Sequence, residues 1–294
     1  MSFNYLIAIN KPQDWTSSDV VIKVRNILSK ALNQKVKIGH MGTLDPLATG
    51  VLLLGINKAT RLFDYMLEKE KEYIGTLTFG TSTDTLDCQG KVLSTSNLPT
   101  LKQIEDTIPL FLGDISQIPP KYSAISINGK KAYDLAREGK DFEIAPRSVK
   151  IYNLRLIDYE GDKEAVKSVK LDVECSSGTY IRTLFYDIAQ KMNVDGHMSM
   201  LNRVKLANVS LDNTTTIDEF VASPLDHFIN PLDVLKNLME VYELNDEEFY
   251  DVQRGVGIKL DKEVNTIAMT KNGEIKFIAK KIDGKYKSQT NLEW

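Results

Sequence analysis

Apolar and polar residues recur with two different periods along the chain, and these periods predict a mixture of helices and strands. From Glu72 to Phe79 every second residue is apolar, which is typical of a strand and places Tyr73 at its start. After the hydroxyl residues 16–18, apolar residues recur at spacings of three and four up to Leu32, which predicts a capped amphipathic helix. The same reasoning predicts strands at 5–9, 51–56, 122–127, 149–158 and 169–175, and helices at 58–67, 100–112 and 130–137.

The pattern changes beyond about residue 235. Asn245 and the acids after it read as a helix cap with an acidic first turn, and this helix ends at Gly255. Short alternating segments then flank Asn272-Gly273, a pair typical of a tight hairpin. We therefore expect a small, mainly β C-terminal domain.

Composition excludes several classes of protein. The 294 residues are 42% hydrophobic and 26% charged, which is ordinary globular material. No apolar run approaches the roughly 20 residues needed to span a bilayer, and the N-terminus lacks a secretory signal, so we expect a cytoplasmic protein that does not bind membranes. Cys88 and Cys175 are isolated thiols, which supports neither a disulfide framework nor a zinc site.

Charge is distributed unevenly, although the formal net charge is only -3. No acid lies between Asp19 and Asp45, whereas that stretch contains Lys23, Arg25, Lys30, Lys35, Lys37 and His40. A second basic region lies between Lys121 and Lys150. Such runs are usually solvated faces, but the first leads directly to Asp45, which favours a surface that follows phosphates.

The segment from Gly39 to Gly50 fixes one carboxylate in a turn framed by glycines. Pro46 restricts its own φ and favours an extended conformation at Asp45. An Asp-Pro pair often does no more than begin a turn. A lone, oriented aspartate is also what a nucleophile requires, and aspartate is ionised at neutral pH because its reference pKa is about 4.

Arg182 is predicted in the first turn of a helix that follows a strand and the turn at 176–179. A cation there opposes the helix dipole, so we expect an anionic partner for it. An arginine paired with Asp45 would orient that carboxylate, and Tyr73 could stack on a flat ring and transfer a proton. Together these three residues suit attack on a sugar or a base.

Four stretches together closely resemble the bacterial tRNA pseudouridine(55) synthase family. They are Gly39–Gly50, Lys71–Tyr73, Gln117–Ala124 and Cys175–Thr183, and they follow the family's order over the first four fifths of the chain. Four long motifs in order are far more specific than any one of them. The C-terminal part resembles the family's small RNA-binding β domain of PUA type, mainly by its position.

The resemblance implies an α+β fold with a mixed, largely antiparallel sheet flanked by helices and a PUA-like β domain. We expect a catalytic domain over 1–238, with a mobile insertion at about 128–146 that closes on RNA, and the PUA-like domain over 239–294. The implied activity is isomerisation of a uridine in the TΨC arm of tRNA to pseudouridine by a monomer, without cofactor or metal.

The resemblance also implies roles for six residues. Asp45 matches the nucleophile, Arg182 its paired arginine, and Tyr73 the tyrosine that stacks on the target base and shuttles a proton. His40 matches the histidine that fills the space left by the flipped-out base. Tyr180 and Leu201 match positions that line the uracil pocket, although each could be simple packing. The sequence leaves open whether Asp45 adds to C1' of the ribose, adds to C6 of the uracil, or drives elimination to a glycal.

Two other functions remain open at this stage. A noncatalytic RNA-folding protein could keep the same scaffold, although the intact set of Asp45, Tyr73 and Arg182 disfavours it. A glycosidase-like hydrolase would need a second carboxylate, for which Asp84 and Asp87 are the nearest candidates. Arg182 could also pair with another acid such as Asp187. His197 and His227 have no set of candidate catalytic residues around them in the sequence and are assigned no role.

Overall fold

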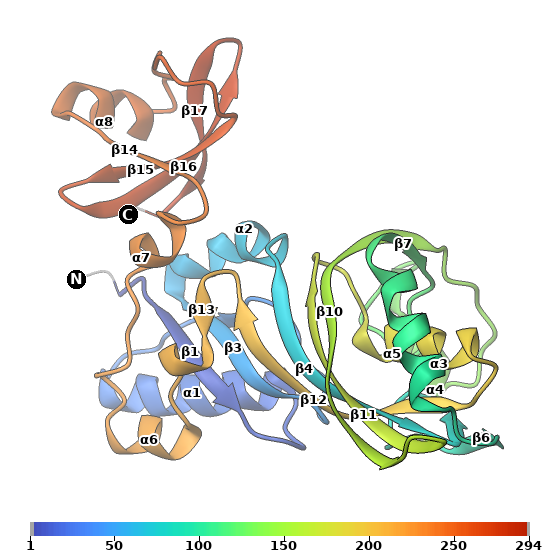
Figure 1. Cartoon of the computed structure of the whole chain (residues 1–294). Coiled ribbons are helices and arrows are strands. Elements are labelled where there is room, and N and C mark those ends of the chain that lie inside the picture. Colours follow the sequence, from blue (N-terminus) through green and yellow to red (C-terminus); the bar gives the residue numbers. More distant parts are fainter. Residues whose placement is uncertain (1–2, 293–294) are drawn as a thin grey trace. The chain divides into compact units, whose positions relative to one another are not determined.

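The computed structural model describes residues 3–292, and its contacts divide the chain into two compact units (Figure 1). Unit 1 combines Met1–Leu67 with Lys205–Trp294, and unit 2 is Glu68–Val204. Both ends of the chain thus belong to unit 1. The sequence predicts a different division, into a catalytic domain over 1–238 and a C-terminal domain over 239–294. This domain boundary stays a prediction.

The N-terminal part of unit 1 is a small antiparallel sheet beside one long helix. Strand β3 (Thr49–Ile56) pairs with both β1 (Leu6–Lys11) and β2 (Ile38–His40). Helix α1 (Ser17–Ala31) buries an apolar stripe and begins in a capping box. These elements confirm the predicted strands and helix in this region and frame the turn that contains Asp45.

The rest of unit 1 comes from the C-terminal third of the chain. A four-stranded sheet has the order β14-β15-β16-β17, in which only β14 and β15 are parallel. The predicted hairpin at Asn272-Gly273 joins β15 to β16, and both turn residues have positive φ. The elements are β13 (Val209–Ser210), η3 (Leu211–Asn213), α6 (Ile217–Ala222), α7 (Pro231–Leu235), β14 (Glu240–Glu243), α8 (Asp246–Gln253), β15 (Thr266–Lys271), β16 (Glu274–Ile282) and β17 (Lys285–Asn291).

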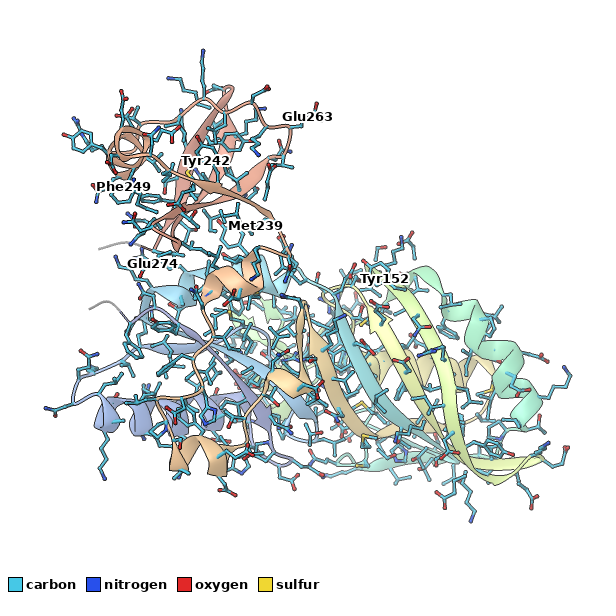
Figure 2. The ribbon with its side chains drawn as sticks, turned by 60° about the vertical axis from the view of Figure 1, so that its left-hand side comes forward. Tyr152, Met239, Tyr242, Phe249, Glu263 and Glu274 are labelled. Atoms are coloured by element: carbon cyan, nitrogen blue, oxygen red, sulfur yellow. The ribbon has the colours of Figure 1, made fainter. Side chains whose placement is uncertain are left out.

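Two apolar clusters hold this C-terminal sheet. One lies within it, where Phe249 of α8 and Tyr242 of β14 pack against a core that includes Phe277 (Figure 2). The other is shared with the N-terminal strands, because Ile278 and Leu292 belong to the same buried cluster as Leu6, Leu53 and others. The sheet therefore has a core of its own and a second core that it shares with the start of the chain.

Unit 2 is built on an antiparallel-rich sheet in the order β12-β4-β11-β10-β7. In β4 the odd-numbered residues from Lys71 to Phe79 are buried and the even-numbered ones are half-buried, as the alternation predicts. Helix α5 packs on this sheet, where a Cβ added to Gly75 would lie 2.9 Å from the Phe185 ring and one added to Gly196 would lie 2.7 Å from Ala189. The strands are β4 (Lys71–Phe79), β5 (Thr81–Thr83), β6 (Val92–Thr95), β7 (Gly113–Gln117), β8 (Ser126–Ile127), β9 (Lys130–Lys131), β10 (Arg147–Asp162), β11 (Ala165–Cys175) and β12 (Gly196–Leu206); the helices are α3 (Leu101–Thr107), η2 (Ile108–Phe111), α4 (Ala132–Arg137) and α5 (Ile181–Lys191).

Three predictions of local structure are wrong in part. The helix expected at 100–112 is α only as far as Thr107 and then becomes the 3-10 turn η2, since Pro109 lacks an amide donor. Residues 58–67 likewise divide between η1 (Asn57–Leu62) and α2 (Phe63–Leu67).

The strand expected at 122–127 is also wrong over most of its length, and several strands were not foreseen, β7 and β12 among them. Only Ser126–Ile127 is a strand, because the carbonyl of Ser123 instead accepts a hydrogen bond from the amide of Tyr133 at 3.0 Å. Strands β7 and β12 are absent from the prediction. In β7 the alternation is short and half-exposed, and β12 begins with three consecutive buried residues at 196–198, so neither shows a clear period of two.

Within residues 3–292, none of the helices combines the length and the apolar composition that crossing a bilayer requires.

Candidate active site

Asp45 lies in the turn between β2 and β3, in unit 1. Gly42 and Gly50 have φ values of 120° and 101°, a region that glycine adopts without steric cost, so the turn needs these residues on either side of Asp45. Leu44 and Leu47 are buried while Asp45 between them is half-buried. The apolar neighbours therefore anchor the turn in the core, and Asp45 between them keeps part of its surface exposed.

Ser17 at the start of α1 holds the Asp45 turn directly. Its hydroxyl donates to the carbonyl of Leu44 at 3.0 Å and accepts from the Leu44 amide at 2.9 Å. The sequence grouped Ser17 with the capping hydroxyls, but the cap is Thr16, which forms a capping box with Asp19. Ser17 thus fixes the residue before Asp45. The sequence did not predict this role, because Ser17 stands beside Thr16 and Ser18 in a run of hydroxyl residues that is typical of a helix cap.

Lys11 holds the other side of the turn, and sequence reasoning missed it. The side chain is fully buried, and its ammonium donates to the carbonyls of Pro12, Trp15 and Pro46 at 2.8, 2.7 and 3.2 Å. A buried ammonium needs such acceptors because isolated burial of a charge is very costly. The end of β1 and the residue after Asp45 are therefore joined by one cation.

His40 ends β2, five residues before Asp45. Its backbone pairs with Leu54 of β3, and its side chain is half-buried. The structure thus places His40 directly before the Asp45 turn, in the same unit, and the role implied for it in RNA binding stays a prediction.

Tyr73 and Leu201 lie in neighbouring strands of unit 2. Tyr73 is on the buried face of β4, where Gly75 is the next residue. A Cβ at Gly75 would lie 3.2 Å from Leu201 Cδ1 of β12, so the missing side chain leaves the space that Leu201 occupies. The structure therefore brings these two predicted pocket residues to one face of the sheet.

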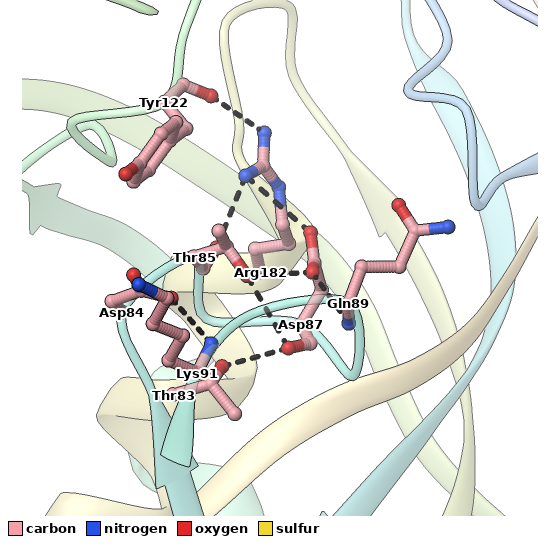
Figure 3. A network of polar contacts seen from close by, with 8 residues as sticks. All are labelled: Thr83, Asp84, Thr85, Asp87, Gln89, Lys91, Tyr122 and Arg182. Atoms are coloured by element: carbon pink, nitrogen blue, oxygen red, sulfur yellow. Dashed lines mark hydrogen bonds and ion pairs between the residues drawn. The ribbon is translucent and has the colours of Figure 1, made fainter. Parts of the chain in front are cut away.

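Arg182 is buried in the first turn of α5, as predicted, and its guanidinium contacts two separate loops (Figure 3). One terminal nitrogen donates to the carbonyl of Thr85 at 3.1 Å, and the other donates to that of Tyr122 at 3.0 Å. The first nitrogen also forms an ion pair with Asp87, with 3.6 Å between Nη1 and Oδ2. Arg182 thus has an anionic partner, and within unit 2 this partner is Asp87 and not Asp187.

Asp87 is itself held in place by its loop. Its Oδ1 accepts hydrogen bonds from the Thr85 hydroxyl at 2.7 Å and from the Gln89 amide at 3.1 Å, which leaves Oδ2 directed at Arg182 (Figure 3). Asp84 in the same loop has a different task, because its Oδ1 accepts from the Lys91 amide at 2.8 Å. The two carboxylates considered for a hydrolase are therefore both engaged in the structure of this loop.

Tyr180 immediately precedes α5 and is held on two sides. The Arg147 guanidinium lies 4.7 Å from the centroid of its ring, a cation–π arrangement. The Gln117 side chain forms hydrogen bonds with both the amide and the carbonyl of Tyr180. Neither neighbour was identified from the sequence as part of the site, although Gln117 begins one of the motifs.

Two buried groups near Tyr73 titrate abnormally. Burial, together with the positive charge of Arg203, lowers the pKa of Lys71 to about 8. Burial raises the pKa of the Cys175 thiol to about 11, so this thiol is protonated at neutral pH and is a poor nucleophile. Among residues 3–292, the structure contains no cluster of three or more His, Cys, Asp or Glu residues that could hold a metal ion.

The predicted residues are thus divided between the units. His40 and Asp45 belong to unit 1, while Tyr73, Tyr180, Arg182 and Leu201 belong to unit 2. Within each unit these residues lie on anchored turns, strand faces or helix ends. The pairing of Asp45 with Arg182 stays a prediction.

The fold is shared with chains in two solved H/ACA RNP structures. One is in the structure of an H/ACA RNP bound to a substrate RNA containing 2'-deoxyuridine, with a TM-score of 0.73, 20% identity and coverage of 99% of this chain and 85% of that one. Another is in an archaeal box H/ACA sRNP Nop10-Cbf5 complex, with a TM-score of 0.70, 19% identity and coverage of 98% and 86%. At this identity the likeness shows the class of fold, an antiparallel-rich sheet with helices and a C-terminal β sheet.

Sequence relatives define the family. Residues 29–181 match the family described as TruB family pseudouridylate synthase, N-terminal domain. The chain is 41% identical over 236 residues to tRNA pseudouridine synthase B of Caldanaerobacter subterraneus subsp. tengcongensis, covering 78% of this chain and 80% of the relative. It is 40% identical over 275 residues to the protein of that name from Streptococcus sanguinis, covering 90% and 91%. The chain belongs to the TruB family of pseudouridylate synthases.

Proposed function

We propose that this enzyme isomerises the uridine at position 55, in the T arm of tRNA, to pseudouridine, with Asp45 as the nucleophile. The observation that carries the proposal is the Asp45 turn: a single carboxylate, half-buried, on a turn fixed by Ser17 and Lys11, in a chain of this family. Relatives at 35–41% identity bear the name tRNA pseudouridine synthase B, which supports tRNA as the substrate.

The reaction itself sets the demands on the residues. The N1–C1' bond of the nucleotide breaks, the uracil rotates, a C5–C1' bond forms, C5 loses its proton and N1 gains one. Atoms and electrons balance within the nucleotide, so the chemistry requires no redox cofactor. An ionised aspartate can form a transient bond to one fragment by addition to C1' or to C6. It can instead act as a base that takes the proton from C2', so that the N1–C1' bond breaks and a glycal forms, and that proton returns to C2' when the C5–C1' bond is made.

The other site residues receive roles that their chemistry suits. Tyr73 stacks on the uracil and transfers the proton from C5, and Arg182 stabilises the carboxylate of Asp45 once water has left the site. Asp87 orients Arg182 through the ion pair described above. His40 takes the place of the extruded base, while Tyr180 and Leu201 line the uracil pocket.

Exposed cations in both units suit the RNA backbone. In unit 1 these are Lys23, Arg25, Lys30, Lys35 and Lys37, and in unit 2 they are Lys130, Lys131 and Lys140 of the insertion. Neutralising phosphates releases counterions, so we expect RNA affinity to fall steeply with salt. We further propose that the insertion at 128–146, with α4 at its centre, closes on the RNA.

Tritium release tests the function. Unmodified tRNA carrying tritium at C5 of uridine is incubated with the wild type and with Asp45→Asn. We expect release by the wild type, and from the variant a rate lower by at least about a thousandfold with RNA binding retained. Equal release by both proteins would remove Asp45 from its role, and binding without release by either would favour the noncatalytic RNA-folding protein. Free uracil in place of pseudouridine would instead indicate a hydrolase.

A further inference from the structure

Gln117 is a buried amide that the proposed reaction does not use directly. It is the last residue of β7, where it pairs with Arg147 of β10, and only 1% of its surface is exposed. Its Nε2 donates to the carbonyl of Tyr180 at 3.1 Å, while its Oε1 accepts from the Tyr180 amide at 2.8 Å. The side chain thus bonds to the backbone of one residue on both sides, as a neighbouring strand would.

The start of α5 needs such an external support. Tyr180 is the N-cap of this helix but makes no side-chain capping bond, and the first turn contains no acid. Other helices, such as α1 and α8, begin in capping boxes that satisfy the first amides locally. In addition, Arg182 places a cation in the first turn, which the helix dipole disfavours. Gln117 accepts from the Tyr180 amide, as the side chain three residues after the cap does in a capping box, and so supplies from β7 one of the two bonds that the local sequence of α5 lacks.

The neighbour of Gln117 in the ladder holds the ring of the same residue. Arg147 lies over the Tyr180 ring, and its guanidinium also donates to the carbonyl of Gly178. Two paired residues of the β7–β10 ladder therefore restrain the backbone and the side chain of Tyr180 together. Both restraints act on a residue that we place in the uracil pocket, two positions before Arg182.

We propose that Gln117 is a positioning residue for the isomerisation, which rests on the proposed function: its two bonds to the Tyr180 backbone fix the Tyr180 ring against the base. Reactions that depend on precise placement lose about 100-fold in rate for a displacement near 1 Å. A purely structural role for Gln117 would change the amount of folded protein and leave the rate per folded molecule unchanged.

Three variants separate these outcomes. Gln117→Met keeps the volume and removes both hydrogen bonds, and Gln117→Glu keeps the acceptor for the Tyr180 amide but loses the donor to its carbonyl. Val149→Ala is the matched control. Val149 is buried on the same β7–β10 ladder, opposite Ile115, and its side chain forms none of the hydrogen bonds that hold Tyr180. For each protein the folded fraction, the tRNA dissociation constant and the single-turnover rate of tritium release are measured.

We expect Gln117→Met to lower the single-turnover rate about 100-fold per folded molecule and Gln117→Glu to lower it about 10-fold, with tRNA affinity within about threefold of the wild type. Val149→Ala should lower stability and keep its rate. If Gln117→Met does not fold, the Gln117→Glu variant decides by the same measurements.

A double-mutant cycle tests whether Gln117 affects the rate through the Tyr180 ring. In the background of Tyr180→Leu, which removes the ring, the additional loss caused by Gln117→Met should shrink to less than about threefold, because both changes act through one residue. Additive losses, or a wild-type rate per folded molecule in the Gln117 variants, would overturn the positioning role alone. Absence of release by the wild type would overturn the proposed function with it.

Discussion

Asp45 in unit 1 and Arg182 in unit 2 are held in opposite ways. The Asp45 turn is fixed through its main chain, by the Ser17 hydroxyl on Leu44 and by the Lys11 ammonium on Pro46. Arg182 is fixed by its own charged group, which contacts Asp87 and two carbonyls. The backbone on either side of Asp45 is thus anchored by two side chains, whereas Arg182 is anchored through its guanidinium.

The two buried charges that support these residues, Lys11 and Asp87, therefore have different structural roles. Lys11 is a cation that holds a turn through backbone carbonyls, whereas Asp87 is an anion that pairs with the Arg182 guanidinium. Changing Lys11 or Ser17 should therefore act mainly on stability, and changing Asp87 should act on turnover as well. Four changes test this contrast, in order of decreasing effect.

Asp87→Asn should have the largest effect. The amide keeps the shape and an acceptor for Thr85 and Gln89 but leaves the Arg182 guanidinium buried without that countercharge, which costs about 3 kcal/mol or more. We expect the single-turnover rate to fall about 100-fold, with tRNA affinity retained. Asp84→Asn in the same loop is the control, and an equal loss of rate in both variants would contradict a specific role for Asp87.

Lys11→Met should come next and should affect stability. The thioether keeps the length of the side chain, but the carbonyls of Pro12, Trp15 and Pro46 lose a buried donor, at about 1–3 kcal/mol each before relaxation. Denaturant unfolding should show a net loss of about 2–4 kcal/mol, while the exposed control Lys23→Met changes little. An unchanged midpoint for Lys11→Met would show that the ammonium does not support the turn.

Ser17→Ala should have a smaller effect of the same kind. It removes the hydroxyl that both donates to and accepts from Leu44, so we expect unfolding to become easier by about 1–2 kcal/mol. Ser18→Ala, one residue further along α1, serves as the control. If the two alanine variants have the same unfolding midpoint, the contact between Ser17 and Leu44 contributes nothing measurable.

Asp187→Asn should give the smallest effect, and one that depends on pH. Burial raises the pKa of Asp187 on α5 to about 6, from an ordinary value of 3.8. Between these two values the folded protein holds a proton that the unfolded chain has released, so the free energy of unfolding falls as pH rises. The carboxyl is only half-buried, and screening should limit the loss at pH 7 to about 1 kcal/mol.

Unfolding curves of wild type and Asp187→Asn at several pH values check this. The variant should be the more stable protein at pH 7 and should match the wild type below about pH 4. Glu164→Gln, an exposed change, should show no such difference. A constant difference at every pH would indicate a packing effect and not a titration.

The sequence predicted those features that depend on nearby residues. The strand that contains Tyr73 follows from a period of two, and the placement of Arg182 in a first helical turn follows from the segment around it. The strand at 122–127 was wrong because a tertiary bond competes with propensity at Ser123, whose carbonyl bonds to α4, whereas the end of the helix at 100–112 depends on Pro109.

The supports of the site could not be predicted in the same way. Lys11 reaches a carbonyl 35 positions away, and Arg182 reaches one 97 positions away. No local pattern marks a lysine whose partners are carbonyls, or distinguishes Asp87 from Asp84 in one polar turn. Composition and periodicity describe single elements, whereas these contacts depend on how the elements are brought together.

The cluster shared by Leu6, Leu53 and Leu292 has a consequence for biosynthesis. Strands β1 and β3, which frame the Asp45 turn, share this buried cluster with Ile278 of β16 and with Leu292, which follows β17. We therefore expect that a nascent chain arrested before β17 leaves these strands incompletely covered and open to chaperones, so that the Asp45 turn reaches its final setting only after β17 has been translated.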